Sequence, residues 1–383
     1  MRYKQFTPAA ICGVLLLYTV VSAAEIKVGV AAALTGNAAQ YGLPIRKGLE
    51  LAADEINGKG GINGARLKLI VEDEQGKKEE AINVFKKLIF QDRVLVVFGP
   101  TLSNSAQASD PVAQGARVVV FGTSNTADGI TSIGDYVFRN SVTERDILPF
   151  TLKTAARKTA LRKVAVLYGN DDIFTKSGYD NFKKVLEDLK IPVTTTETFA
   201  KGDVGFKPQL TKIKSTNPDA IILSALVAEG APIMVQARQL DISLPFIGGN
   251  GMNSPRIFEL AKGSSDNLWV GSPWSLENPA PENKRFIAAY QKTYGAMPDQ
   301  FAAQAYDAMY IVAEALKELR LTGNLETDRK AVRDALPATE WTGATGPFKF
   351  RQVLGRGGKG LGYDAVQTAI VMVTKASRYI IQN

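Results

Sequence analysis

Histidine is absent from this chain of 383 residues, and cysteine occurs once, at Cys12. Without histidine there is no Ser-His-Asp triad, no histidine-metal site and no ordinary proton shuttle near neutral pH. These absences weigh against an enzyme. Cys12 lies in a segment that we expect to be removed, so the mature chain has neither a disulfide nor a reactive thiol. A lipid anchor at Cys12 is disfavoured because the bulky Ile11 precedes it.

Long apolar runs are also scarce. The run at residues 9–21 is too short for a membrane span of about 20 residues, and Arg2 and Lys4 precede it. Small residues at 22–24 supply a cleavage site. We therefore predict an export signal at residues 1–24, a mature chain that begins near Glu25, and a soluble periplasmic protein.

The charge pattern shows no nucleic-acid interface. The formal net charge of +8 falls to +6 once Arg2 and Lys4 leave with the signal. The remaining basic residues are mixed with acidic ones and are not interleaved with aromatic platforms. They are typical of a solvated surface, so we expect no nucleic-acid partner.

Apolar β-rich runs alternate with helical patterns along the chain, which predicts an α/β protein with parallel sheets. Two sets of strands are expected, each forming one open sheet with covering helices. The first set is residues 26–32, 67–72, 94–98, 118–121 and 136–139, and the second is 164–168, 193–198, 220–224 and 245–248. Residues 139–143 and 346–350 are expected to cross between the sheets, and 365–374 to form the final strand.

Short motifs recur in a fixed order along the mature chain. They are Leu34-Thr35-Gly36 with Gln40-Tyr41-Gly42, Asp54-Glu55-Ile56-Asn57 before residues 60–64, residues 99–105 (GPTLSNS), Ser124-Asn125-Thr126, Asn170-Asp171-Asp172, and Tyr306-Asp307-Ala308. In this order and spacing the chain resembles the branched-chain amino acid type of periplasmic solute-binding protein, the ligand-receiving component of an ABC importer.

The resemblance implies the type I periplasmic binding protein fold, in which two doubly wound parallel-sheet lobes close on a ligand through a three-segment hinge. The crossings would fall near Ser141, Ser272 and Pro347. The N-terminal lobe would then comprise residues 25–142 plus 272–346, and the C-terminal lobe 143–271 plus 347–383. It also implies the permease subunits of an importer in the inner membrane as partners. Because the mature chain has no cysteine and no second apolar run, we expect a monomer, and we expect no cofactor.

Ligands of open α/β sheets sit beyond the carboxyl ends of the strands, and two hydroxyl-rich loops follow predicted strands there. Helix N-termini favour a carboxylate. The resemblance assigns the ligand carboxylate to Ser103, Ser124 and Thr126, and places Tyr41 in the side-chain pocket. From spacing alone, the hydroxyls would merely cap helices.

The other lobe departs from the family pattern. Asn250 stands where amino-acid binders usually have an acid for the ligand ammonium, Leu226 replaces an aromatic residue, and Phe174 replaces a tyrosine. Glu229 would restore the charge if its loop turns inward, but it fits equally well as a helix N-terminal carboxylate. We expect a branched-chain or other apolar amino acid as ligand. The alternative is an aromatic or branched carboxylic acid without an ammonium.

An enzyme and a ligand sensor are the two competing functional classes. Residues 355–360 (GRGGKG) match a dinucleotide fingerprint in form, yet they follow no buried strand and open no helix, so we interpret them as a turn. Asp171 and Asp172 are interpreted as turn residues at the cleft rather than as a catalytic pair. A ligand sensor with the same two lobes remains the second alternative, because fold does not fix function.

Overall fold

The computed structural model describes residues 25–382, so the predicted export signal lies outside the described residues. Within this range no helix is both long and apolar enough to cross a membrane.

The strands are β1 (Glu25–Ala32), β2 (Arg66–Asp73), β3 (Val96–Phe98), β4 (Val119–Gly122), β5 (Val137–Arg139), β6 (Val164–Gly169), β7 (Val193–Phe199), β8 (Ala220–Ser224), β9 (Phe246–Gly248), β10 (Leu268–Ser272), β11 (Trp341–Gly343), β12 (Gly346–Leu354), β13 (Gly360–Val366), β14 (Ile370–Lys375) and β15 (Arg378–Ile381). The α-helices are α1 (Ala39–Gly58), α2 (Lys78–Lys86), α3 (Ser103–Gly115), α4 (Glu144–Thr159), α5 (Ile173–Asp188), α6 (Lys207–Ser215), α7 (Val227–Gln239), α8 (Arg256–Ala261), α9 (Pro281–Tyr294), α10 (Gln300–Lys317) and α11 (Leu325–Ala335). Short helical turns are η1 (Lys87–Gln91), η2 (Thr131–Ile133), η3 (Asn250–Met252), η4 (Leu336–Ala338) and η5 (Arg356–Gly358).

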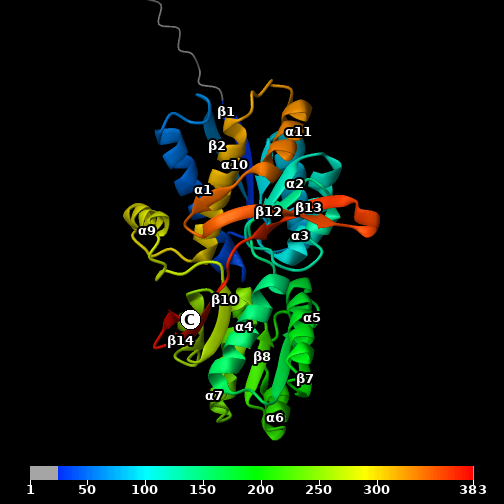
Figure 1. Ribbon diagram of the computed structural model, residues 1–383, viewed down its shortest axis with the longest axis vertical. Coiled ribbons are helices and arrows are strands. Elements are labelled where there is room, and N and C mark those ends of the chain that lie inside the picture. The colour runs from blue at the N-terminus through cyan, green and yellow to red at the C-terminus, as the bar shows by residue number, and fades with distance from the viewer. Residues whose placement is uncertain (1–24, 383) are drawn as a thin grey trace, which may run out of the picture.

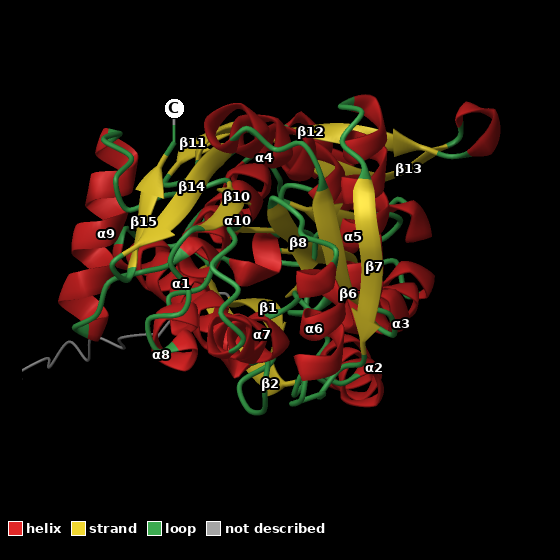
Figure 2. Ribbon diagram, turned by 90° about the horizontal axis from the view of Figure 1, so that it is seen from below, coloured by secondary structure: helices red, strands yellow, loops and turns green. Residues whose placement is uncertain are grey.

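The strands form two open sheets, one in each of two lobes that are stacked along the long axis (Figure 1). The first sheet has the order β11-β12-β13-β5-β4-β3-β1-β2, and the second has the order β15-β14-β10-β9-β8-β6-β7. All pairs from β5 to β2 and from β10 to β7 are parallel. Antiparallel strands extend one edge of each sheet, such as β14 and β15 in Figure 2. The predicted α/β architecture with two doubly wound lobes is confirmed.

Helices cover both faces of each sheet, which explains the unbroken apolar runs of the central strands. In β3, Val96 and Phe98 pack on the side of α1 and α10, whereas Val97 packs with α2 and α3. In β6, Val164 and Val166 pack with α4 and α5. The opposite face of the second sheet packs against α6 and α7.

The third crossing between the lobes was predicted near Pro347, and the sheet order corrects it. Both β12 and β13 belong to the first sheet, and the chain enters the second sheet only at β14. The crossing is therefore at residues 367–369, and residues 347–366 belong to the first lobe. The other two passages lie between β5 and α4 and between β10 and α9, near the predicted Ser141 and Ser272.

Gly346 and Pro347 begin the second strand of a β-hairpin instead of a crossing, and the turn of that hairpin is residues 344–345. Gly346 has a φ of 88°, a left-handed conformation that suits glycine, at the start of β12. Pro347 pairs with Thr342 of β11, and the pairing of β12 with β13 begins only at Lys349. Position 347 therefore makes no backbone hydrogen bond to β13, so a proline, which lacks an N–H group, is tolerated there.

Helices α1 and α10 pack closely, and this contact predicts a stability effect. A Cβ on Gly48 would lie 2.2 Å from the carbonyl oxygen of Ala302, too close for any side chain. We expect Gly48→Ala to force the helices apart and to lower the free energy of unfolding by about 1–3 kcal/mol, measured by urea denaturation.

Gly58 is the matched control at the end of the same helix. A Cβ there meets no atom within 4 Å, so Gly58→Ala should leave stability unchanged or raise it by up to about 1 kcal/mol. Equal effects of the two substitutions would contradict the proposed close packing.

Candidate functional site

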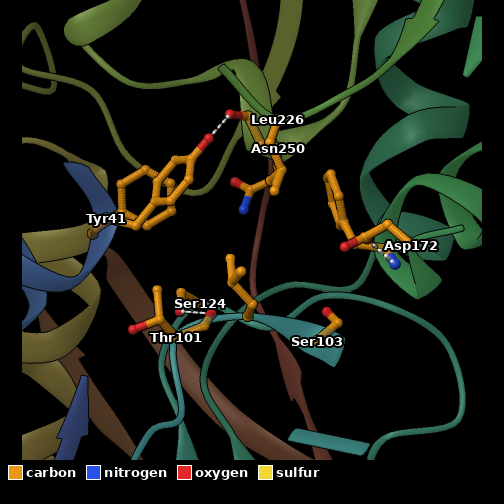
Figure 3. A pocket seen from close by; sticks show the side chains of 11 residues that line it. Tyr41, Thr101, Ser103, Ser124, Asp172, Leu226 and Asn250 are labelled. Atoms are coloured by element: carbon orange, nitrogen blue, oxygen red, sulfur yellow. Dashed lines mark hydrogen bonds between the residues drawn. The ribbon is translucent and has the colours of Figure 1, made fainter. Parts of the chain in front are cut away.

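A cavity lies between the two lobes, at the carboxyl ends of the parallel strands of both sheets (Figure 3). The empty space among its lining atoms is about 350 Å³, a figure that includes solvent at its mouth. Its lining consists of Tyr41, Thr101, Leu102, Ser103, Ser124, Asp172, Phe174, Leu226, Asn250, Gly251 and Phe301.

Six of the eight residues predicted from the sequence are among these: Tyr41, Ser103, Ser124, Phe174, Leu226 and Asn250. Thr126 and Glu229 are not. The site also contains residues that the sequence analysis did not select. Thr101 and Leu102 lie inside the GPTLSNS motif and could have been found there. Phe301 lies in α10, and nothing in the sequence marks it as a residue of the cavity.

The first-lobe wall is built on the loop between β3 and α3, which a buried acid holds. Glu74 accepts hydrogen bonds from Thr101 N at 3.2 Å, Gly76 N at 3.1 Å and Ser105 Oγ at 3.0 Å. Burial raises the pKa of Glu74, and these donors oppose that effect. Glu74 therefore fixes the loop that presents Ser103 to the cavity.

The start of α3 offers donors to an anion. Leu102 is the N-cap and no side chain caps the helix within the described residues, so its first N–H groups and partial positive charge face the cavity. Ser103 Oγ accepts from Ala127 N at 3.3 Å, which leaves its own proton free. Ser124 Oγ instead donates to the carbonyl oxygen of Thr101 at 2.6 Å. This wall is therefore suited to a carboxylate.

Thr126 lies behind that wall and links the lobes. Its Oγ1 donates to Glu144 Oε1 at 3.2 Å, and the same oxygen accepts from Asn250 N at 3.1 Å. Glu144 is fully buried, and within residues 25–382 its Oε2 has no partner. Burial raises the pKa of Glu144 to about 7, although the two donors favour its charged form.

Asp172 is the acid that lines the second-lobe wall. Its Oδ1 caps α5 by accepting from Phe174 N at 2.8 Å and Thr175 N at 3.3 Å, and its Oδ2 accepts from Asn104 Nδ2 at 2.5 Å. Burial raises its pKa. The sequence analysis placed this residue in a turn at the cleft but did not select it as a ligand-binding residue. The available signal was an acid directly after a buried strand and before a helix.

Glu229 does not reach the cavity. It lies in the first turn of α7, and its Oε1 accepts from Gly202 N at 3.0 Å. Burial raises the pKa of its carboxyl group. Of the two interpretations left open by the sequence, the helix N-terminal carboxylate matches this position.

Tyr41 joins the two lobes from α1. Its Oη donates to the carbonyl oxygen of Gly251 at 2.8 Å and accepts from Val227 N at 2.9 Å. Its ring packs edge-on against Phe301, with centroids 4.9 Å apart. Burial raises the pKa of Tyr41, so its hydroxyl keeps its proton. These contacts describe a closed pair of lobes.

Comparison with known proteins identifies this architecture. A sequence model of the periplasmic binding protein family matches residues 25–362. The chain belongs to this family. The resemblance noted from the motifs is therefore confirmed.

Relatives within the periplasmic binding protein family span nearly the whole chain. The leucine-, isoleucine-, valine-, threonine- and alanine-binding protein of Pseudomonas aeruginosa is 28% identical over 330 residues, 86% of each chain. The branched-chain amino acid transporter substrate binding protein LivJ from Streptococcus pneumoniae, solved with isoleucine, has a TM-score of 0.84 at 29% identity and covers 93% of this chain and 97% of its own.

A third protein shares the fold and was solved with a different ligand. A solute binding protein of an ABC transporter from R. palustris, solved with benzoate, has a TM-score of 0.79 at 23% identity and covers 93% of this chain and 95% of its own. These relatives and fold neighbours are binding proteins of transporters rather than enzymes. Within residues 25–382 no group of three or more acidic, histidine or cysteine side chains is arranged to hold a metal.

Removing the Tyr41 hydroxyl should loosen the contact between the lobes. Tyr41→Phe leaves Val227 N–H and the Gly251 carbonyl without their cross-lobe partner. We expect faster hydrogen exchange at the Val227 amide, and more open protein in small-angle X-ray scattering.

Tyr379→Phe is the control for Tyr41→Phe. Tyr379 Oη donates to the carbonyl oxygens of Met252 and Ser254, both in its own lobe. This variant should lose stability without opening the lobes. Identical scattering of wild-type protein and Tyr41→Phe would contradict the role of Tyr41.

Glu144 should make stability depend on pH. Its folded-state pKa of about 7 exceeds the ordinary 4.5, so the folded protein keeps a proton that the unfolded chain releases between these values. Wild-type stability should therefore fall, relative to Glu144→Gln, as the pH rises from 4.5 to 7, by up to about 3 kcal/mol. Urea unfolding of both proteins at pH 4.5 and pH 8 measures this difference, and parallel pH profiles would refute it.

Proposed function

We propose that this protein is the extracytoplasmic solute-binding component of an ABC importer and that it captures an α-amino acid of branched-chain size. The observation that carries the proposal is the opposite polarity of the two cavity walls. The uncapped start of α3 faces the cavity from the first lobe, and the Asp172 carboxylate faces it from the second. An α-amino acid carries a matching pair of charges.

The charges around the cavity favour a ligand with a cation. Asp172 is the only charged residue among the lining residues, and no described lysine or arginine lines the cavity. Glu144 and Glu229 add buried acids behind the second-lobe wall, and the nearby Lys201 is exposed. A carboxylate without an ammonium would add negative charge here, whereas a zwitterion adds none.

The remaining surface of the cavity suits a short branched side chain. Leu102, Phe174, Leu226 and Phe301 supply apolar contacts in a small space. The proteins from Pseudomonas aeruginosa and Streptococcus pneumoniae are named as binders of branched-chain amino acids, which supports the same ligand class here.

The proposed role in an importer requires that binding of the ligand favours closure of the two lobes. The cavity is formed by both lobes, so a ligand that contacts both walls stabilises the closed shape. Permease subunits in the inner membrane would then receive the closed, loaded form.

An aromatic carboxylic acid is the second candidate ligand. The rings of Tyr41, Phe174 and Phe301 line the cavity, and the neutral Asn250 stands in place of the expected acid. Asp172 also accepts three hydrogen bonds from the protein, which reduces its need for an ammonium partner.

Calorimetry with Asp172→Asn separates the two candidates. The substitution keeps an oxygen that can cap α5 and removes the charge. We expect leucine binding to weaken by about 1.5–3 kcal/mol, because a hydrogen bond to a charged group is lost. Binding of 4-methylpentanoate, which is leucine without its ammonium, should stay the same or improve.

Glu229→Gln serves as the matched control, because its carboxyl group bonds to Gly202 N outside the cavity. This variant should weaken leucine binding much less than Asp172→Asn does. Strong leucine binding that ignores Asp172→Asn would remove Asp172 from the site, and binding of benzoate without leucine would establish the second candidate.

A further inference from the structure

Asn250 presents an unpaired polar group to the cavity. It opens η3 directly after the loop that follows β9, it is 3% exposed, and it lies across the pocket from Thr101 and Ser124 (Figure 3). Its Oδ1 accepts from Gln300 Nε2 at 2.6 Å. Among residues 25–382 no partner is found for its Nδ2, which points into the pocket.

Gln300 decides which end of the Asn250 amide faces the ligand. Gln300 is the first residue of α10 and is buried. Its Oε1 accepts from Asn253 Nδ2 at 2.7 Å. Ser272 Oγ lies 2.8 Å from the same oxygen, but it shares its single proton with the carbonyl oxygen of Trp274 at 2.7 Å. Because the Asn253 NH₂ group donates to this oxygen, the Gln300 NH₂ group points at Asn250 Oδ1. Asn250 must then turn its own NH₂ group toward the cavity.

We propose that Asn250 donates a hydrogen bond to an oxygen on the end of the ligand remote from its carboxylate, and that Gln300 is the positioning residue that sets this polarity. The inference rests on the proposed function, because it takes the ligand carboxylate to lie at the start of α3. The ligand is then an amino acid of branched-chain size whose side chain carries a hydroxyl, carbonyl or amide oxygen.

The physical reason is the cost of a buried donor without a partner. A hydrocarbon side chain leaves Asn250 Nδ2 unpaired in a closed cavity, whereas an oxygen pairs with it. An ammonium has only donors, so it is excluded from this position and is directed to Asp172. The polarity is opposite to that of the acid that the family resemblance led us to expect at position 250.

The test compares two ligands of nearly equal shape by calorimetry. In 2-amino-4-oxopentanoate a ketone oxygen and a methyl group replace the two methyl groups of leucine, and the ketone accepts hydrogen bonds but donates none. We expect the ketone to bind wild-type protein about tenfold more tightly than leucine, the effect of one hydrogen bond to a buried donor.

Two variants test the roles of Asn250 and Gln300 through the ratio of the two affinities. Asn250→Asp keeps the acceptor for Gln300 and removes the donor, so the preference for the ketone should disappear. Gln300→Glu cannot donate to Asn250 Oδ1. The Asn250 amide should then turn its NH₂ group to the new carboxylate and its oxygen to the cavity, which also abolishes the preference. A purely structural defect would weaken both ligands alike and leave the ratio unchanged.

Gln304→Glu provides the matched control one helical turn away. Gln304 is buried on α10 but does not line the cavity, so its variant should keep the wild-type ratio. Should Gln300→Glu fail to fold, Asn250→Asp alone decides the polarity of the position.

The outcomes also separate this inference from the proposed function. Leucine and the ketone binding equally well would overturn the role of Asn250 and leave the amino-acid ligand intact. If neither amino acid binds, the proposed ligand is wrong, and 4-acetylbenzoate against 4-isopropylbenzoate repeats the comparison. Absence of a preference for the oxygen in that pair, including absence of binding, overturns the inference.

Discussion

The carboxyl ends of the parallel strands in both sheets face each other, and the site consists of the loops that leave those ends. Thr101 follows β3, Ser124 follows β4, Asp172 follows β6, and Asn250 follows β9. Helix α1, which carries Tyr41, follows β1. None of these loops needs to be long, because neighbouring parallel strands end at the same edge of a sheet and helices begin there. The same geometry directs the N-terminus of α3 into the cavity. The parallel arrangement of the strands therefore determines both where the first-lobe wall lies and that this wall carries hydrogen-bond donors and partial positive charge.

The groups that face the cavity depend on buried partners outside it. Glu74 holds the loop before α3, Asn104 holds Asp172, and Gln300 holds Asn250. Each partner is a polar side chain in a place where burial is unfavourable unless its hydrogen bonds are made. Residues that do not themselves contact the ligand therefore set which donors and acceptors the cavity wall presents to it. A substitution behind the wall can change ligand preference without altering the shape of the cavity.

Much of this arrangement follows from the sequence. Strands such as β3 and β8 are buried on both faces, so their apolar runs predicted them and the α/β fold. The hydroxyl loops were predicted because they follow two such buried strands, β3 and β4. The third crossing was misplaced because a Gly-Pro pair such as Gly346-Pro347 suits a hairpin as well as a crossing. The positions of the acidic side chains were still harder to predict from the sequence. Asp172 folds back on its own helix, whereas Glu229 reaches Gly202, 27 residues away along the chain. Local spacing does not reveal a partner so distant.

Hydrogen bonds between the lobes favour the closed form, whereas the burial of a charged side chain on closure opposes it. Tyr41 bonds to Gly251 and Val227, and Asn104 bonds to Asp172, so several hydrogen bonds exist only while the lobes are closed. Each contributes about 0.5–1.5 kcal/mol net. Closure also buries Asp172, whose raised pKa reflects the cost of keeping its carboxylate charged away from water. The two contributions have opposite sign, so the burial of charge opposes closure of the empty protein. A ligand that brings a cation to Asp172 and an anion to α3 reduces the cost without removing the hydrogen bonds. The ligand therefore shifts the balance toward the closed form.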